Sequence, residues 1–204
     1  MHLLDQRTLG VVILTLLALL VIVKRLATGN IIRDVPNRGF GLWLVHVFNL
    51  FFLLVVNPIA GILLVAGRLE RVDVTRLALA FPAAIVLEGA GVMLYLLGYF
   101  VMAWALLTLG RHYQVGGSVP RSADRLVAEG PYGVVRHPMY AAALCISLGL
   151  ALLTQSLALL AVAVIYLVLI IPLMPFEEDG LRRAYGNQYV GYSRRVRRLV
   201  PFVY

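Results

Sequence analysis

The chain has 204 residues, of which 61% are hydrophobic and only 14% are charged, and its mean hydropathy is +0.90. Soluble domains carry about 25% charged residues, so the composition excludes an ordinary soluble enzyme, a disordered chain and, with Cys145 as the single cysteine, a disulfide-rich module. The net charge of +8 would fit a nucleic-acid partner, unless the basic residues gather at membrane boundaries.

Long apolar runs predict membrane-spanning helices, because about 20 apolar residues cross the hydrocarbon. We expect a first span at Leu9–Ala27 and a second between Gly39 and Gly67, bent at Asn57-Pro58. A third begins near Phe81 and ends at Gly110. The 39 residues 138–176 contain no Asp, Glu, Lys or Arg and would be about 58 Å long as one helix. We therefore predict a hairpin that breaks at residues 154–156, and five spans in all.

Charge distribution predicts the orientation of these spans. The segments 24–38, 110–136 and 177–204 share one side and hold 14 of the 18 Lys and Arg residues. The positive-inside rule then places the C-terminus in the cytoplasm and the N-terminus outside. No small-residue cleavage site follows the first run, so we interpret it as a retained anchor. The excess of basic residues is explained by membrane topology and by attraction to anionic lipid, so no nucleic-acid partner is expected.

Glu88, His46 and Asn49 are polar residues within the predicted spans. An acid such as Glu88 inside a membrane segment is either functional or part of helix packing near the outer interface. His46 and Asn49 are expected to form hydrogen bonds between helices. No Cys/His cluster has the spacing of metal ligands, so no metal is expected.

The segment 110–136 is too long for a plain connector and leads into Pro138, which suits the first turn of a helix. The N–H groups at that helix start, beside Arg136 and His137, could bind a carboxylate or phosphate. The alternative is that Arg136 and His137 are interfacial anchors. His112, at the end of the third span, is either an active-site residue or a headgroup contact.

The C-terminal segment combines acids with an amphipathic pattern. Glu177, Glu178 and Asp179 follow the last apolar run directly. Apolar and tyrosine side chains from Leu181 to Val196 recur at helical spacing, which predicts an amphipathic helix on the cytoplasmic face. Alone, this segment would fit a basic membrane-surface tail.

Both segments belong to the same hairpin, so the acids and His137 should be neighbours. A pocket there would offer carboxylates for an ammonium group, helix N–H groups for a carboxylate, and tyrosine faces for a cation. This set fits an amino-acid-containing cofactor with a positive centre, such as a sulfonium.

Four motifs at these positions resemble the isoprenylcysteine carboxyl methyltransferase family and the related phospholipid N-methyltransferases: LVAEGPYGVVRHPMY, Glu177-Glu178 with Leu181, YGNQYVGY and RRLVPFVY. The resemblance implies S-adenosylmethionine as cofactor and an all-α membrane domain spanning 1–204, with the methyltransferase core at 77–204 and the first two spans at 1–76. The last two spans would form a helical hairpin, with the loop and a C-terminal amphipathic helix closing the cofactor site. The implied cofactor-binding residues are Leu126, Val127, Gly130, Tyr132, His137, Pro138, Tyr140, Glu177 and Glu178.

The resemblance also implies a lipidated acceptor that enters from the bilayer and is methylated on a carboxyl oxygen. The carboxyl methyltransferases carry an Arg four residues before the acidic pair, where this chain has Leu173. Arg136 or Arg111 could replace it in orienting the acceptor. An amine acceptor would need a base, for which Glu177, Glu178 or His112 are candidates. We therefore take Arg136, Glu178 and His112 as catalytic candidates.

Other functions stay open at this point. Within the same superfamily, the acceptor could be a phospholipid amine or a thiol. A sterol-type membrane reductase also carries a His-Pro motif but binds NADPH. A third possibility is a non-enzymatic membrane protein.

Overall fold

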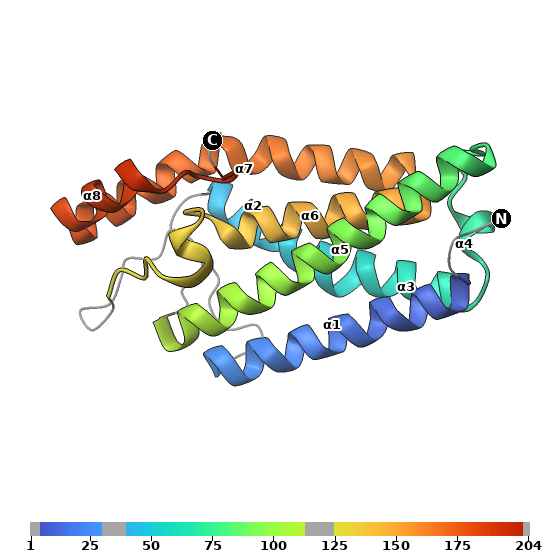
Figure 1. Ribbon diagram of the computed structural model, residues 1–204, viewed down its shortest axis with the longest axis horizontal. Helices are drawn as coiled ribbons and strands as arrows, with labels where there is room; N and C mark the ends of the chain where they lie inside the picture. The colour runs from blue at the N-terminus through green and yellow to red at the C-terminus, as the bar shows by residue number, and fades with distance from the viewer. Residues whose placement is uncertain (1–4, 30–39, 113–124, 202–204) are drawn as a thin grey trace.

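The computed structural model describes residues 5–29, 40–112 and 125–201. Within these ranges the chain is helical, and β-pairing is limited to two isolated bridges. The elements are α1 (Gln6–Thr28), α2 (Phe40–Phe51), η1 (Phe52–Val56), α3 (Asn57–Val65), α4 (Leu69–Val72), α5 (Phe81–Leu109), η2 (Gly110–His112), η3 (Gly130–Gly133), α6 (Pro138–Thr154), α7 (Leu157–Tyr185) and α8 (Asn187–Arg195). Figure 1 shows the long helices side by side, with the connections gathered at two opposite ends.

The protein is an integral, multi-pass membrane protein of the all-α class, as predicted. Four helical stretches are long and apolar enough to cross a membrane: Gln6–Thr28, Trp43–Val65, Phe81–Leu109 and Leu157–Tyr185. The fifth, α6, is a shorter apolar helix of 17 residues. The third span begins at Phe81 as expected, with Pro82 in the first turn, where its missing N–H costs nothing.

At the predicted bend of the second span, Asn57-Pro58, the structure has a π-helical turn, η1, which ends at Val56 and is followed directly by α3. Because Pro58 has no N–H to donate, the regular pattern shifts, and the Asn57 N–H donates to the Phe52 carbonyl. The Asn57 side chain is fully buried. Its Nδ2 donates to Phe52 O at 3.2 Å, and its Oδ1 accepts from the Tyr95 hydroxyl at 3.0 Å. The irregular turn thereby joins the second span to α5.

Glycine contacts fix the position of α6 against α5. A methyl group at Gly149 would lie 2.6 Å from the backbone N of Tyr95, and one at Gly91 would lie 2.7 Å from the backbone N of Leu153. The two backbones therefore touch, as small residues permit between membrane helices. This contact sets the axis of α6, and so the place of His137 at its N-terminal end.

The α6–α7 hairpin turns at residues 154–156, which confirms the predicted break. Gln155 lies in the left-handed region with φ of +54°, and the Ser156 Oγ caps α7 by accepting from the Leu159 N–H at 3.1 Å. The Gln155 side chain donates to the carboxylate of Glu88, which is 4% exposed, at 3.3 Å. At this turn end of the hairpin, Glu88 takes part in packing α5 against the turn.

The C-terminal helices differ from the prediction. An apolar span ending at Phe176 followed by one amphipathic helix over Leu181–Val196 was expected, but α7 continues to Tyr185 and α8 covers only Asn187–Arg195. Gly186 separates them with φ of +53°, a conformation that glycine adopts at little cost. The prediction of one continuous helix is therefore wrong, although the tyrosines at 189 and 192 do share its buried face.

Candidate functional site

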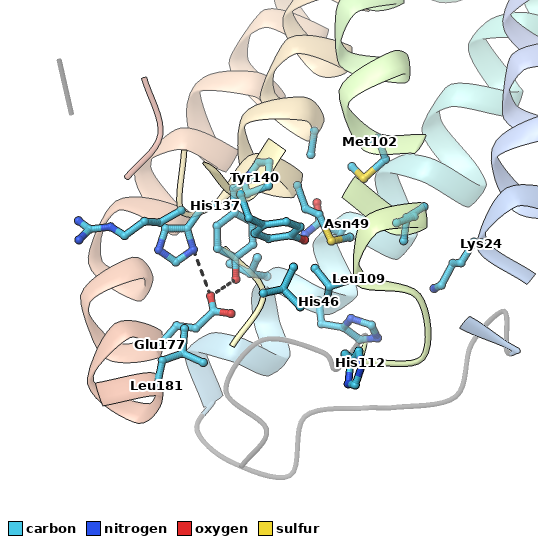
Figure 2. A pocket seen from close by; sticks show the side chains of 18 of the residues that line it. Lys24, His46, Asn49, Met102, Leu109, His112, His137, Tyr140, Glu177 and Leu181 are labelled. Atoms are coloured by element: carbon cyan, nitrogen blue, oxygen red, sulfur yellow. Dashed lines mark hydrogen bonds and ion pairs between the residues drawn. The ribbon is translucent and has the colours of Figure 1, made fainter. Parts of the chain in front are cut away.

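At the mouth end of the hairpin, opposite the turn, the start of α6 meets the last turns of α7. The His137 Nδ1 lies 3.6 Å from Oε2 of Glu177, and the Tyr140 hydroxyl donates to the same oxygen at 3.0 Å. The His137 and Tyr140 rings stack with centroids 5.5 Å apart. Figure 2 shows the Glu177 carboxylate between these two side chains. The predicted proximity of the two hairpin mouths is confirmed.

The neighbouring acid, Glu178, is 3% exposed and is held by three side chains. Its Oε1 lies 3.2 Å from the His137 Nε2 and 3.1 Å from the Arg136 Nε. Arg198 contacts both oxygens, with Nε donating to Oε1 at 3.1 Å and Nη2 donating to Oε2 at 3.2 Å. A buried carboxylate needs such partners to offset its desolvation.

Residues 196–199, here named the C-terminal strap, run beside the segment that leads into α6. The Arg136 N–H donates to the Arg197 carbonyl at 2.7 Å, and the His137 N–H donates to the Arg198 carbonyl at 2.9 Å. Leu199 is buried in an apolar cluster with α7. The strap thus covers the backbone at the start of α6.

Helix α8 is attached to the same region by two further hydrogen bonds. The Tyr192 hydroxyl donates to the Tyr132 carbonyl at 2.7 Å, and the Arg136 Nη1 donates to the Ser193 carbonyl at 2.9 Å. The loop before α6, the strap and α8 therefore form one connected cover over the mouth end.

A cavity of about 300 Å³ begins under this cover and extends between the helices. Its polar end includes His137, Tyr140 and Glu177. Its apolar walls come from α1, η1, α5 and α6 and include Leu20, Val21, Phe52, Met102, Leu106 and Ile146. A charged end joined to apolar walls suits a ligand with a polar and a lipid-like part.

Most of the site residues predicted from sequence line this cavity: Leu126, Val127, Tyr132, Arg136, His137, Pro138, Tyr140, Glu177 and His112. Two predicted residues lie elsewhere. Glu178 lies behind His137, in the network with Arg198. Gly130, with φ of +58°, packs on α5, since a methyl group there would lie 2.9 Å from the Thr108 hydroxyl.

Tyr189 was not singled out as a ligand-binding residue by the sequence reasoning, which placed it on an amphipathic face. It is fully buried and lines the cavity, and its hydroxyl has no hydrogen-bond partner among the described residues. Burial raises the pKa of Tyr189 and of its neighbour Tyr192, so both phenols stay protonated at neutral pH. The Tyr189 hydroxyl is thus a donor available to a ligand.

Basic and neutral polar residues of the first two spans also reach the cavity. Lys24, His46 and Asn49 are part of its lining; no local motif around Lys24 signalled this. Figure 2 shows Lys24 and His112 on the side away from Glu177. Leu173, on α7, instead packs against the apolar cluster that includes Tyr166 and Met174. The Arg111 side chain lies outside what the structure describes.

Metal chemistry has no evident ligand set in this part of the chain. Among the described residues, no group of three or more His, Cys, Asp or Glu side chains is arranged to hold a metal ion. The cavity instead presents one carboxylate, aromatic rings and an unpartnered phenol, a donor and acceptor set that fits an amino-acid-containing cation such as S-adenosylmethionine.

Comparisons with known proteins give one family and two kinds of named relative. The family model for phospholipid methyltransferases matches residues 87–188, half of the chain. Protein-S-isoprenylcysteine O-methyltransferase B of Arabidopsis thaliana is 34% identical over 119 residues, covering 57% of this chain and 60% of that protein. The cobalt-zinc-cadmium resistance protein CzcN of Cupriavidus metallidurans is 31% identical over 138 residues, covering 65% of this chain and 64% of that protein. The chain thus spans less than two thirds of these relatives' lengths.

The fold also has a solved counterpart. A eukaryotic intramembrane Ras methyltransferase, isoprenylcysteine carboxyl methyltransferase, aligns with a TM-score of 0.55 at 22% identity, covering 79% of this chain and 74% of that chain. This likeness concerns the fold. With the family match and the curated relatives, it confirms the resemblance predicted from the four motifs.

Proposed function

We propose that this chain, which belongs to the phospholipid methyltransferase family, transfers a methyl group from S-adenosylmethionine to a lipidated acceptor in the membrane. One observation carries the proposal. The Glu177 carboxylate, set beside His137 and Tyr140, stands at the polar end of a cavity whose walls are apolar. A polar cofactor and a lipid-like acceptor would meet in such a cavity.

In this proposal Glu177 contacts the cofactor's ammonium group, and His137 with the first N–H groups of α6 contacts its carboxylate. Tyr140 holds the Glu177 carboxylate in place through its 3.0 Å hydrogen bond. Leu126, Val127, Tyr132 and Pro138 contribute lining around the remainder of the cofactor. Gly130 shapes this loop by its close contact with α5.

S-adenosylmethionine supplies a methyl group already activated by a sulfonium. The chain therefore needs to align the reactants and exclude water, which can lower a barrier by up to about 7–11 kcal/mol in the best cases. The cover formed by the loop, the strap and α8 serves this purpose. The rings of Tyr189 and Tyr192, which pack edge to face at 5.8 Å, present aromatic surface toward a cation.

The charges around the cavity favour an anionic acceptor. Among the described lining residues, Glu177 is the only acid, whereas Lys24, Arg125 and Arg136 are basic. An anion would be repelled by the Glu177 carboxylate, and Figure 2 shows Lys24 and His112 on the side of the cavity away from Glu177. We therefore assign the acceptor's anion to that side. An isoprenylcysteine-like carboxylate is the acceptor that this arrangement suits, and it needs no general base at neutral pH.

The acceptor is tested with purified protein in lipid nanodiscs, S-adenosylmethionine labelled in the methyl group, and three acceptors: a prenylcysteine, phosphatidylethanolamine and a small thiol. We expect a base-labile ester from the prenylcysteine. A base-stable product would assign N- or S-methylation instead, with His112 as the candidate base. Binding of labelled NADPH in place of the methyl donor would contradict the proposed function altogether.

Replacing Lys24 tests whether this residue contacts the acceptor and not the cofactor. Lys24→Met should raise the KM for a carboxylate acceptor about tenfold, because one charge-assisted contact is lost, while the Kd for S-adenosylmethionine stays unchanged. Lys24→Arg, which keeps the charge, is the matched control. An unchanged KM in Lys24→Met would remove this assignment.

We also propose that the mouth end faces the cytoplasm, because the segments at this end carry most of the basic residues. Cysteines introduced singly at Arg194 on α8 and at Val74 beside the turn end should react with a membrane-impermeant thiol reagent from opposite sides of sealed vesicles. Labelling of both from one side would contradict the orientation.

A further inference from the structure

We propose that Glu178 is a positioning residue that holds the C-terminal strap over His137, whereas Glu177 faces the ligand. The two acids are adjacent on α7, and successive residues of an α-helix point about 100° apart. Glu177 accordingly lines the cavity, while Glu178 is buried toward Arg136 and Arg198. The ligand half of this proposal rests on the proposed function, and the strap half does not.

Both oxygens of Glu178 are already occupied by groups of the chain. Arg198 donates to each of them, and His137 and Arg136 approach Oε1 at 3.2 and 3.1 Å. To bind a ligand's ammonium group, Glu178 would have to give up contacts with these charged partners. Glu177 has one described hydrogen bond, from Tyr140, and is the more accessible carboxylate, at 20% exposure against 4%.

Through Arg198, Glu178 controls backbone pairing at the start of α6. The Arg198 guanidinium donates to Glu178, and the Arg198 carbonyl accepts a hydrogen bond from the His137 N–H at 2.9 Å. The preceding pair, from the Arg136 N–H to the Arg197 carbonyl, is 2.7 Å long. Releasing the Arg198 side chain should therefore loosen both backbone hydrogen bonds.

Glu178 also orients the His137 ring. The contact at Nε2 directs the opposite nitrogen, Nδ1, toward Glu177 in the cavity wall. A carboxylate that contacts one ring nitrogen of a histidine fixes the orientation of the ring, and so the direction in which the other nitrogen points. Glu178 thus acts on the ligand side through His137, without reaching the cavity itself.

Amide hydrogen exchange of Arg136 and His137 tests the strap directly, since their N–H groups are the donors to it. We expect Glu178→Gln and Arg198→Gln each to raise exchange at these two amides by about 10- to 100-fold, and the double variant to exchange no faster than the faster single variant. Glu177→Gln should leave these amides unchanged. Arg195→Gln, at an exposed arginine that ends α8 just before the strap, is the matched control and should behave as wild type.

Cofactor binding separates the two acids. Glu177→Gln should weaken the Kd for S-adenosylmethionine strongly, whereas Glu178→Gln and Arg198→Gln should weaken it to the same smaller extent. Arg198→Lys should recover part of the loss. Glu178→Gln that abolishes binding while the Arg136 and His137 amides stay protected would make Glu178 a ligand contact and overturn the proposal. A wild-type protein that binds no S-adenosylmethionine would reject the proposed function, yet leave the exchange result to stand on its own.

Discussion

The two ends of the α6–α7 hairpin both bury polar side chains, but they use them differently. At the turn end, Gln155 donates to Glu88, and Arg76 Nε donates to the Thr154 carbonyl at 2.8 Å. None of these residues lines the described cavity. At the mouth end, His137 and Glu177 contact each other and also line the cavity.

The difference shows what separates a structural polar cluster from a candidate site. Burial alone does not, because His137, which lines the cavity, is 6% exposed and Glu88, which does not, is 4% exposed. Within the described chain, the discriminating feature is polar surface that remains directed at an open space after local contacts are made. By this criterion Glu177 is a site residue, whereas Glu88 and Glu178 are held by their neighbours.

The largest effect on stability should come from a substitution that pushes α6 away from α5, because this contact positions both ends of the α6–α7 hairpin. In Gly149→Val the new side chain would meet the Tyr95 backbone, where even a methyl group would lie 2.6 Å from its N. Because a backbone cannot move aside as a side chain can, we expect a loss of about 3 kcal/mol or more. A thiol-reactive dye that reports exposure of Cys145, the single cysteine, would measure the lowered Tm.

Gly89→Val is the control for that substitution, because the space around Gly89 is open within 4 Å. It lies on the same helix as Gly91 and should change the Tm little. Equal losses in the Gly149 and Gly89 variants would mean that β-branching in the helix, and not the contact between helices, is responsible.

The second effect tests whether the two ends differ in function. Glu177→Gln should weaken S-adenosylmethionine binding roughly 10- to 100-fold, because a charge-assisted contact is lost at an exposed cavity wall. The Tm should change little, since Glu177 makes few contacts with the chain. Isothermal titration in detergent measures the Kd. Glu70→Gln, at an acid with a 63% exposed side chain near the turn end, should leave the Kd unchanged, and a similar loss there would contradict a specific role.

Much of this fold could be predicted from the sequence because the features are local. Apolar runs set the spans, Pro138 marks the start of α6, and the polar residues at 154–156 mark the hairpin turn. The proximity of His137 and Glu177 followed from connectivity alone, since both ends of a hairpin return to the same side.

What could not be predicted depends on rotation of helices and on distant partners. Whether Glu177 or Glu178 faces the cavity is set by the rotation of α7, and the partner of Glu178, Arg198, lies on a segment without periodicity. Lys24 reaches the cavity because α1 packs beside the second span. The extension of α7 to Tyr185 was not predicted, because the span was defined by apolar residues and the last turns of α7 carry charged ones.

The third effect concerns stability without binding. Gln155→Met removes the amide donor to Glu88 and should lower stability by about 1 kcal/mol, while the Kd for S-adenosylmethionine stays at the wild-type value. The same dye and titration measurements apply. A change in Kd without a change in Tm would show that the turn end communicates with the cavity and would break the distinction between the two ends.

The smallest effect is expected from Asp73, in the loop between α4 and α5 that contacts the turn end of the hairpin. Partial burial acts to raise the pKa of Asp73, but hydrogen bonds from Ser156 and Thr75 and the charge of Arg76 outweigh it, so the pKa is lowered. A carboxyl whose pKa is lower in the folded state stabilises the fold above its unfolded pKa of about 3.9 and loses this contribution as the pH falls. Solvent screening limits the gain to below about 0.5 kcal/mol. Asp73→Asn should therefore lower the Tm slightly at about pH 7 and not at about pH 3. Equal shifts at both pH values would assign the loss to the altered hydrogen bonds with Thr75 and not to the charge.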